Sequence, residues 1–506
     1  MGILVNTGET VRVSFGLANY LALVLYLALL LAGGAYFARR EKGTRDFFLG
    51  GQRVRWWAAG ISIFGTQLSA ITFMAIPAKA YDTDWSYILI HITIVLVAPL
   101  VVFFYLPFFR RLNLTTAYEY LEKRFNVAVR LLGAIAFCLM QFGRLGIVLF
   151  LPAIALSTVT NFNIYVCILI MGVVCTIYTT LGGIEAVIWT DVFQVAVLLG
   201  GALLSLVIIA SRVEGGVAHI ADVALQENKF NIVNLTWDYA TASVWVIFLG
   251  NLFSNLIPYS ADQTVVQRYL TTPSEKQAAG AIWTNAAMTL PVATVFFFLG
   301  TALYVFYRAH PHRLHSDLAT DAILPWFIVH ELPGGVAGLV VAAIFAAAMS
   351  SLDSSLNSMA TVLVTDFYHR FRPSATDRAR LWLARISTIL LGVLGTGCAL
   401  IMATYPIKSL WDLFLILLGL LGSGLAGIFA LGIFTRRATG VGAMSGLFSS
   451  TGTLCLVRQC TRVHFFLYGA IGITTCVGVG YLASLILGGR QLCPRSLTVH
   501  GLVKRG

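Results

Sequence analysis

The chain has 506 residues, of which 58% are hydrophobic and only 11% are charged, with a mean hydropathy of +0.83. Soluble domains carry roughly 25% charged residues, so this composition excludes a soluble globular protein and indicates a polytopic membrane protein. The net charge of +12 does not indicate nucleic-acid binding, because the 34 Lys and Arg residues are scattered between apolar runs and form no basic face.

Apolar stretches of about 20 residues, each long enough to cross a bilayer as a helix, recur thirteen times. The predicted spans are residues 15–38, 57–80, 86–109, 128–159, 163–181, 187–211, 243–260, 279–307, 334–368, 381–404, 410–434, 440–457 and 464–488. The first span has no basic region before it and is too long for a signal-peptide core, so we expect it to be retained. The pattern predicts an all-α polytopic membrane protein.

The Lys and Arg residues between the spans are distributed unevenly. If the N-terminus is outside, the inner loops and tail hold 24 of them and the outer segments hold nine. Because cytoplasmic loops are enriched in Lys and Arg, this predicts an outer N-terminus and a cytoplasmic C-terminus. The count treats residues 261–278 as an inner loop, and it leaves Arg144 inside the fourth span as a buried charge.

The run from Gly183 to Gln194 places Glu185 and Asp191 in this apolar chain. A carboxylate at membrane depth costs at least a few kcal/mol unless something positive accompanies it. Asp191 is therefore a candidate for an ion or substrate path, and the accompanying cation need not be a protein side chain.

Two spans carry features that interrupt a helix. Residues 65–72 of the second span combine a glycine with four hydrogen-bonding side chains, and an unwound stretch there would free carbonyls for a cation. In the seventh span Pro258 removes one ladder bond, so Asn255, Pro258 and Tyr259 are predicted to form a hinge or gate. Five spans separate the two breaks, as expected for inverted repeats whose first helix is discontinuous.

This spacing predicts a LeuT-like fold with two five-helix repeats. The expected organisation is an N-terminal peripheral helix and inner loop (1–56), a transport core (57–404) with repeats 57–211 and 243–404, C-terminal peripheral helices (405–488) and a short cytoplasmic tail (489–506).

The ninth span carries a dense polar face between residues 347 and 358. At 3.6 residues per turn, Ser350, Ser354 and Ser358 stack on one side, and Asp353 adjoins them. Hydroxyl and carboxylate oxygens suit a hard cation. The alternative is that these small residues only allow close helix packing, with serines bonding across the interface.

The chain resembles the sodium/solute symporter family over residues 15–488. The matching segments are the Gly183–Gln194 run, the Ser350–Ser358 run and Gln263–Tyr269. Within that family it resembles the bacterial sialic acid symporters through Trp57–Phe64 and Ser69–Tyr81. The resemblance implies a symporter in a bacterial inner membrane, driven by one or two sodium ions and working by alternating access.

The resemblance also implies two sodium sites. The first would use the backbone carbonyls and hydroxyls of Gly65, Leu68, Ala347, Ser350 and Ser351. The second would use Asp191, Ser350, Asp353 and Ser354. Asp353 departs from the family, which has a serine there. This second carboxylate would either bind the cation or share a proton with Asp191.

The implied solute site lies between the broken second span and the third and fourth spans. Its expected residues are Gln67, Ser69, Thr72, His91 and Arg144. Arg144 would hold a solute carboxylate through its planar fork of donors, unless it is a structural partner of a helix end or a gating carboxylate. Gln67 and His91 depart from the sialic acid pattern, which has threonine and glutamine, so the solute is expected to be sialic acid or a related sugar acid.

Other classes of function fit less well. Motifs of metalloproteases, serine hydrolases and P-loop enzymes are absent from the sequence, so an enzyme is not expected. A sodium-coupled carrier of a neutral sugar or polyol is the main alternative, followed by a transporter-like sensor, which the tail of about 18 residues argues against. The expected partners are the solute, sodium and the lipid bilayer, without nucleic acid or an obligate protein partner.

Overall fold

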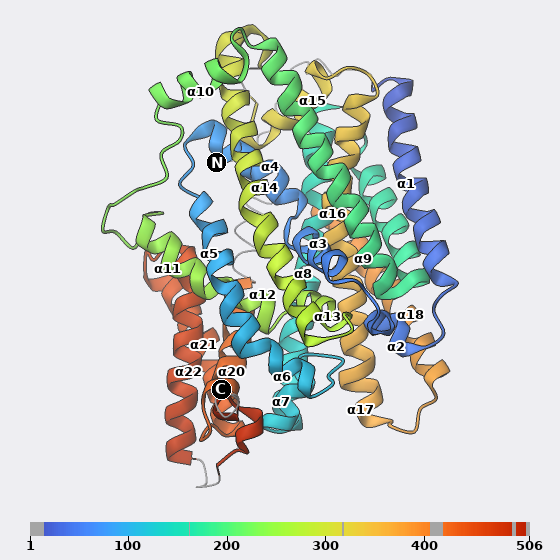
Figure 1. Cartoon of the computed structure of the whole chain (residues 1–506), viewed down its shortest axis with the longest axis vertical. Coiled ribbons are helices and arrows are strands. Elements are labelled where there is room, and N and C mark those ends of the chain that lie inside the picture. The colour runs from blue at the N-terminus through green and yellow to red at the C-terminus, as the bar shows by residue number, and fades with distance from the viewer. Residues whose placement is uncertain (1–14, 161, 316–317, 405–417, 488–491, 502–506) are drawn as a thin grey trace.

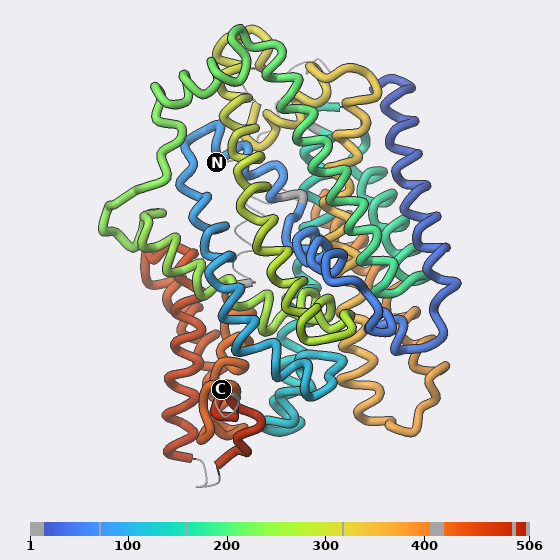
Figure 2. Tube along the Cα trace, in the orientation of Figure 1, coloured from blue at the N-terminus to red at the C-terminus, as the bar shows by residue number. Residues whose placement is uncertain are grey.

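The computed structural model describes residues 15–160, 162–315, 318–404, 418–487 and 492–501. These ranges form a bundle of helices without a β-strand (Figures 1 and 2). The long helices are α1 (Leu17–Ala38), α5 (Ile88–Leu100), α8 (Val127–Val159), α9 (Ile164–Arg212), α14 (Glu275–Ala309), α16 (Val336–Val362), α18 (Asp377–Met402), α20 (Ser423–Phe434), α21 (Gly440–Cys460) and α22 (Tyr468–Leu487).

Shorter helices connect the long ones or extend them. They include α2 (Thr44–Leu49), α6 (Leu106–Arg111), α7 (Tyr118–Arg124), α10 (Gly216–Gln226), α15 (Ile323–Glu331), α17 (His369–Phe371) and the π-helical turns η2 (Val101–Tyr105) and η5 (Leu363–Tyr368). Two further elements are broken helices: α3 (Trp56–Gln67) with α4 (Ala70–Asp82), and α11 (Val244–Ser254) and α12 (Leu256–Ser260) with α13 (Gln263–Leu270).

Among the described residues, nine helices are long and apolar enough to cross a membrane, and the two bent pairs raise the number to as many as eleven. Helix α9 covers two predicted spans, 163–181 and 187–211, and the predicted span 410–434 lies partly outside the described residues. The all-α membrane class is therefore observed, whereas the number thirteen stays a prediction.

Gly183 marks the boundary between the two predicted spans inside α9. Its backbone angles, φ 52° and ψ −152°, are not helical and lie where essentially only glycine is found. A Cβ at this position would meet the Glu41 carboxylate and would lie 2.9 Å from the Phe47 carbonyl oxygen. The glycine thus allows both the break in α9 and the close approach of α2.

We expect Gly183→Ala to destabilise the protein by at least about 2 kcal/mol, because the positive φ and the tight packing each cost an alanine about 1–3 kcal/mol. Thermal unfolding of the purified protein in detergent measures the effect. Gly200→Ala in the same helix is the matched control, since no atom lies within 4 Å of the added Cβ. Equal unfolding temperatures for the two variants would contradict this account.

Helix α16 forms the centre of the bundle. In its most apolar window 89% of the residues are buried inside the protein, against 22% for α1 and 28% for the span of α22. It packs against α9, α8, α1 and α18, and its alanines and serines let these neighbours approach closely. The polar face predicted for this span is therefore placed in the interior and not toward lipid.

The first broken helix interrupts the second predicted span where the sequence indicated. Leu68 and Ser69 have extended backbone angles, and Ser69 caps α4 by accepting a hydrogen bond from the Thr72 backbone N–H. The two segments meet at 60°. The helix end leaves the last carbonyls of α3 without intrahelical partners, because the chain that follows does not continue the ladder.

The second broken helix is interrupted at Asn255, within the predicted stretch, but its large bend lies later in the chain. The bend of 56° falls at Ala261 and Asp262, after α12, and not within residues 255–259. Pro258 lies in the first turn of α12, where its missing N–H removes no necessary bond. The break forms at Asp262 because its side chain caps α13 by accepting from the Thr264 backbone N–H.

Candidate ion and solute site

The end of α3 lies against the hydroxyl-rich face of α16. A Cβ on Gly65 would lie 3.3 Å from the Ser350 hydroxyl, and the Ser351 hydroxyl is 3.5 Å from the Thr66 carbonyl. Ala347, one turn before Ser351, is also buried. The structure thus brings Gly65, Ser350 and Ser351 to one helix junction, while Leu68 follows the last residue of α3.

Asp191 lies at the centre of a second cluster of polar residues. Its side chain is fully buried, and it accepts hydrogen bonds from Ser350 of α16 through Oδ1 and from Ser62 of α3 through Oδ2. Ser354 lies one turn beyond Ser350, and its hydroxyl is 3.0 Å from that of Thr66. Helices α3, α9 and α16 therefore meet at this carboxylate.

The cation that accompanies Asp191 is Arg268 of α13. Its Nη2 lies 2.9 Å from Asp191 Oδ2, and both side chains are 0% exposed. The same guanidinium donates to Ser354 at 2.5 Å and to Ser62 at 2.7 Å. The prediction that residues 261–278 form an inner loop is wrong for Arg268, because residues 263–270 form a buried helix.

Asp353 is held by neutral donors. Tyr178 of α9 donates to its Oδ2 at 2.6 Å, and Ser354 donates to its Oδ1 at 3.2 Å. The Gln194 amide nitrogen is 3.5 Å from the Tyr178 hydroxyl, while the Gln194 amide oxygen is buried without a hydrogen bond among the described residues. The residues of the predicted second sodium site thus offer carboxylate and hydroxyl oxygens, a donor set that suits a hard cation such as sodium.

Arg144 of α8 points at the first break. Its Nη2 donates to the Thr66 carbonyl at 2.8 Å, and its Nε is buried without a hydrogen bond in the described structure. The Gln67 amide nitrogen is likewise buried without one, and the Ser69 and Thr72 hydroxyls lie 3.3 Å apart. Buried donors are almost always paired, so these open donors indicate a place for a ligand that carries acceptors.

His91 is not joined to this group by a hydrogen bond among the described residues. Its ring packs edge-on against Phe297 of α14, with centroids 6.4 Å apart.

The predicted gate residues lie between helices: Asn255 donates to Thr93 of α5 at 2.8 Å, and the Tyr259 hydroxyl accepts from Asn285 of α14.

A further polar chain joins the second break to α8 and α16. The Gln141 amide donates to both oxygens of Asp262 at 3.1 Å, and Ser355 donates to the Gln141 oxygen at 2.9 Å. Asp262, Gln141, Tyr178 and Arg268 are not among the site residues predicted from the sequence. Arg268 could have been noticed because it lies in the segment 263–269, which resembles the symporter family. The other three residues look like ordinary polar residues of apolar spans.

A profile of the Sodium:solute symporter family matches residues 47–450. The chain belongs to this family.

Several members of the family are similar to the chain over nearly its whole length. The sodium/sialic acid symporter NanT of Aliivibrio fischeri is 43% identical, covering 93% of this chain and 94% of that protein. The sodium/sialic acid symporter SiaT of Proteus mirabilis is 41% identical, covering 94% and 97%.

Solved structures agree with this assignment. A Na+-coupled sialic acid symporter, in a substrate-bound outward-open state with a novel Na+ site, has a TM-score of 0.89 and 40% identity, covering 94% of this chain and 98% of that one. The nucleobase-cation-symport-1 family transporter Mhp1, at 18% identity and a TM-score of 0.58, shares the fold. The predicted LeuT-like class and the prediction of a sodium-dependent multi-pass transporter, not an enzyme, are confirmed.

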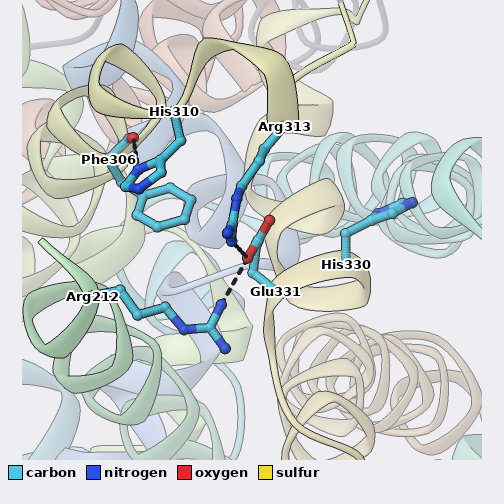
Figure 3. A pocket seen from close by; sticks show the side chains of 6 residues that line it. All are labelled: Arg212, Phe306, His310, Arg313, His330 and Glu331. Carbon is cyan, nitrogen blue, oxygen red and sulfur yellow. Dashed lines mark hydrogen bonds and ion pairs between the residues drawn. The ribbon is translucent and has the colours of Figure 1, made fainter.

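In this symporter a separate pocket of about 520 Å³ lies where α9, α14 and α15 end (Figure 3). Arg212 and Arg313 both reach Glu331 Oε2, at 2.7 and 2.9 Å, and Phe306 and His310 line the same pocket. One carboxylate thus ties three segments together at the end of the bundle where α9 terminates.

We expect Glu331→Gln to lower the free energy of unfolding by about 1 kcal/mol, because ion pairs with part-exposed arginines contribute little. Arg212 and Arg313 are 35% and 43% exposed, so water replaces the lost carboxylate. Thermal unfolding in detergent measures this change, with Asp321→Asn in the segment before α15 as the control. A loss above about 3 kcal/mol would contradict the small contribution expected of part-exposed pairs.

Proposed function

We propose that this protein imports sialic acid, or a closely related sugar acid, together with sodium by alternating access. The observation that carries the proposal is Arg144, whose Nε has no hydrogen-bond partner within the described part of the chain. Its guanidinium lies beside the broken helix that also faces Ser350 and Ser351. A carboxylate would complete its fork of donors. The named sialic acid symporters among the relatives support the same solute class.

In this proposal each ion organises a different helix junction. A sodium ion bound by Gly65, Leu68, Ala347, Ser350 and Ser351 stabilises the first break against α16. A second ion would be bound by Asp191, Ser350, Asp353 and Ser354. Solute binding at Gln67, Ser69, Thr72 and Arg144, with His91 at its margin, then favours a closed state from which rocking of one helix group exposes the ligands to the inside.

Two sodium ions and one anionic solute carry one net positive charge inward. Each such charge gains about 2.3 kcal/mol per 100 mV of membrane potential, so an inside-negative potential should accelerate uptake. The neutral sugar or polyol alternative predicts no need for a carboxylate and leaves the Arg144 donors open.

Uptake into proteoliposomes tests the proposal. We expect radiolabelled sialic acid to accumulate under an inward sodium gradient, not under a potassium gradient, and to be displaced by unlabelled sialic acid but not by glucose, galactose or inositol. Displacement by a neutral sugar at equal concentration would favour the alternative. Accumulation against the solute gradient also excludes a channel.

The orientation, with the N-terminus outside, forms part of the proposal and places the C-terminal end of α21 outside. Cys460 is exposed at that end. In right-side-out vesicles a membrane-impermeant maleimide should label the protein, and Cys460→Ser should remove that label. Labelling of Cys460 only in inverted vesicles would reverse the orientation.

A further inference from the structure

Arg268 forms hydrogen bonds with side chains that are expected to bind the second sodium ion. Its guanidinium bonds two of the four expected side chains, Asp191 and Ser354. It uses Oδ2 of Asp191, whereas Oδ1 accepts only from the Ser350 hydroxyl among the described contacts. One face of the carboxylate is therefore taken by arginine, and the other is bonded to a hydroxyl that is itself an expected sodium ligand.

The buried charges of this cluster do not cancel. Asp191 and Asp353 are both 0% exposed, and the single arginine between them, Arg268, is also 0% exposed. Asp262 and Arg144 lie close enough to interact with Arg268, but they add one charge of each sign. Asp191, Asp353, Asp262 and Arg268 are buried and Arg144 is partly buried, and the five groups together leave one negative charge. An uncompensated buried charge costs several kcal/mol.

The uncompensated negative charge is that of the Asp353 carboxylate. Asp191 has the direct ion pair, whereas the donors to Asp353 among the described residues are the hydroxyls of Tyr178 and Ser354. One sodium ion beside these oxygens would bring the sum to zero while Arg268 stays in place. If residue 353 were a serine, Arg268 and the sodium ion would share a single carboxylate, that of Asp191.

We propose that Arg268 is a built-in competing cation that sets the sodium affinity of the second site, and that Asp353 supplies the charge needed to hold sodium beside it. This inference rests on the proposed function, and it assigns Arg268 a positioning and affinity-setting role. Because Arg268 lies on α13, Asp191 on α9 and Asp353 on α16, sodium affinity depends on where the second broken helix sits (Figure 1). Movement of α13 away from Asp191 would strengthen the site, and bound sodium would in turn favour that movement.

A series of charge variants tests this inference without measuring transport. The readout is the sodium concentration that gives half-maximal thermal stabilisation of the purified full chain, without solute and with choline as the replacing cation. All variants carry Ser351→Ala, so that the proposed first site contributes little. The series is the parent, Asp353→Asn, Arg268→Gln and the double variant.

Charge balance predicts that the two single variants shift the half-maximal sodium concentration in opposite directions, and that the two shifts cancel in the double variant. At the effective dielectric of protein sites, one charge a few ångströms away changes binding by at least about tenfold. We expect Asp353→Asn to raise the half-maximal sodium concentration at least about tenfold, Arg268→Gln to lower it by about as much, and the double variant to return within about threefold of the parent. Shifts in one direction for both single variants, or a double variant that does not return, would overturn the inference.

A second variant keeps the test decisive if Arg268→Gln does not fold. Arg268→Lys retains the charge and loses the fork, so its half-maximal sodium concentration should stay within about threefold of the parent. A larger shift, or an unchanged value for Asp353→Asn, as a carboxyl that holds a proton would give, overturns the inference. If sodium fails to stabilise the unmodified protein at all, the proposed sodium coupling fails instead.

Discussion

Replacing Arg144 with glutamine is expected to lower kcat/KM for sialic acid uptake at least about thirtyfold. Removing one partner of a buried, hydrogen-bonded charge pair costs about 2–5 kcal/mol, and each 1.4 kcal/mol is a factor of ten. The open Nε of Arg144 and its bond to the Thr66 carbonyl place the guanidinium where it can hold a carboxylate without moving the helix end. Initial rates in proteoliposomes over a range of solute concentrations measure the effect.

Two controls separate binding from structure in this experiment. Arg144→Lys keeps the positive charge but offers a single point donor, so it should recover part of the lost affinity. Arg212→Gln removes a part-exposed arginine at the far end of α9 and should leave kcat/KM nearly unchanged. If Arg144→Gln retains the original KM and its sodium-dependent stabilisation, the arginine is structural and the solute carries no carboxylate to this position.

Asp191→Asn is expected to destabilise the protein by about 3–5 kcal/mol, because it leaves the Arg268 guanidinium buried without its anion. The substitution preserves the shape of the side chain, so the loss is that of charge. The ion pair is 0% exposed on both sides, and Ser62 and Ser350 also donate to the same carboxylate. Thermal unfolding in detergent and the yield of monodisperse protein measure the loss.

Glu185→Gln is the matched control, because it removes another carboxylate from the same helix. Glu185 pairs with Arg53 at 3.2 Å and Arg40 at 3.7 Å, and these arginines are 48% and 51% exposed. Water can hydrate them when the partner is lost, so a change within about 1 kcal/mol is expected. Equal destabilisation by the two variants would show that the burial of the Asp191 pair adds nothing.

The residue types of the first break were sufficient to predict its place. Glycine and short polar side chains in an apolar span offer an alternative to the helical ladder, and the structure unwinds at Leu68 and Ser69 within that stretch. In the seventh span the interruption at Asn255 lies within the predicted stretch, but the 56° bend at residues 261–262 was not predicted, because Pro258 is the stronger local signal. The decisive residue is Asp262, whose cap on α13 is supported by Gln141 of a distant helix.

The class of this protein could be predicted from its residues alone, because hydropathy, charge bias and the serine-rich span depend on composition and on spacing along one helix. The sequence also identified Asp191 and Arg144 as charges at membrane depth, since their cost is local. The pairing of Asp191 with Arg268, which lies 77 positions further along the chain, became visible only in the folded arrangement of the helices. From its sequence, a short helix with an arginine cannot be distinguished from a charged loop. The side chains that bury Arg268 and stabilise its charge come from three other helices, which are remote in sequence.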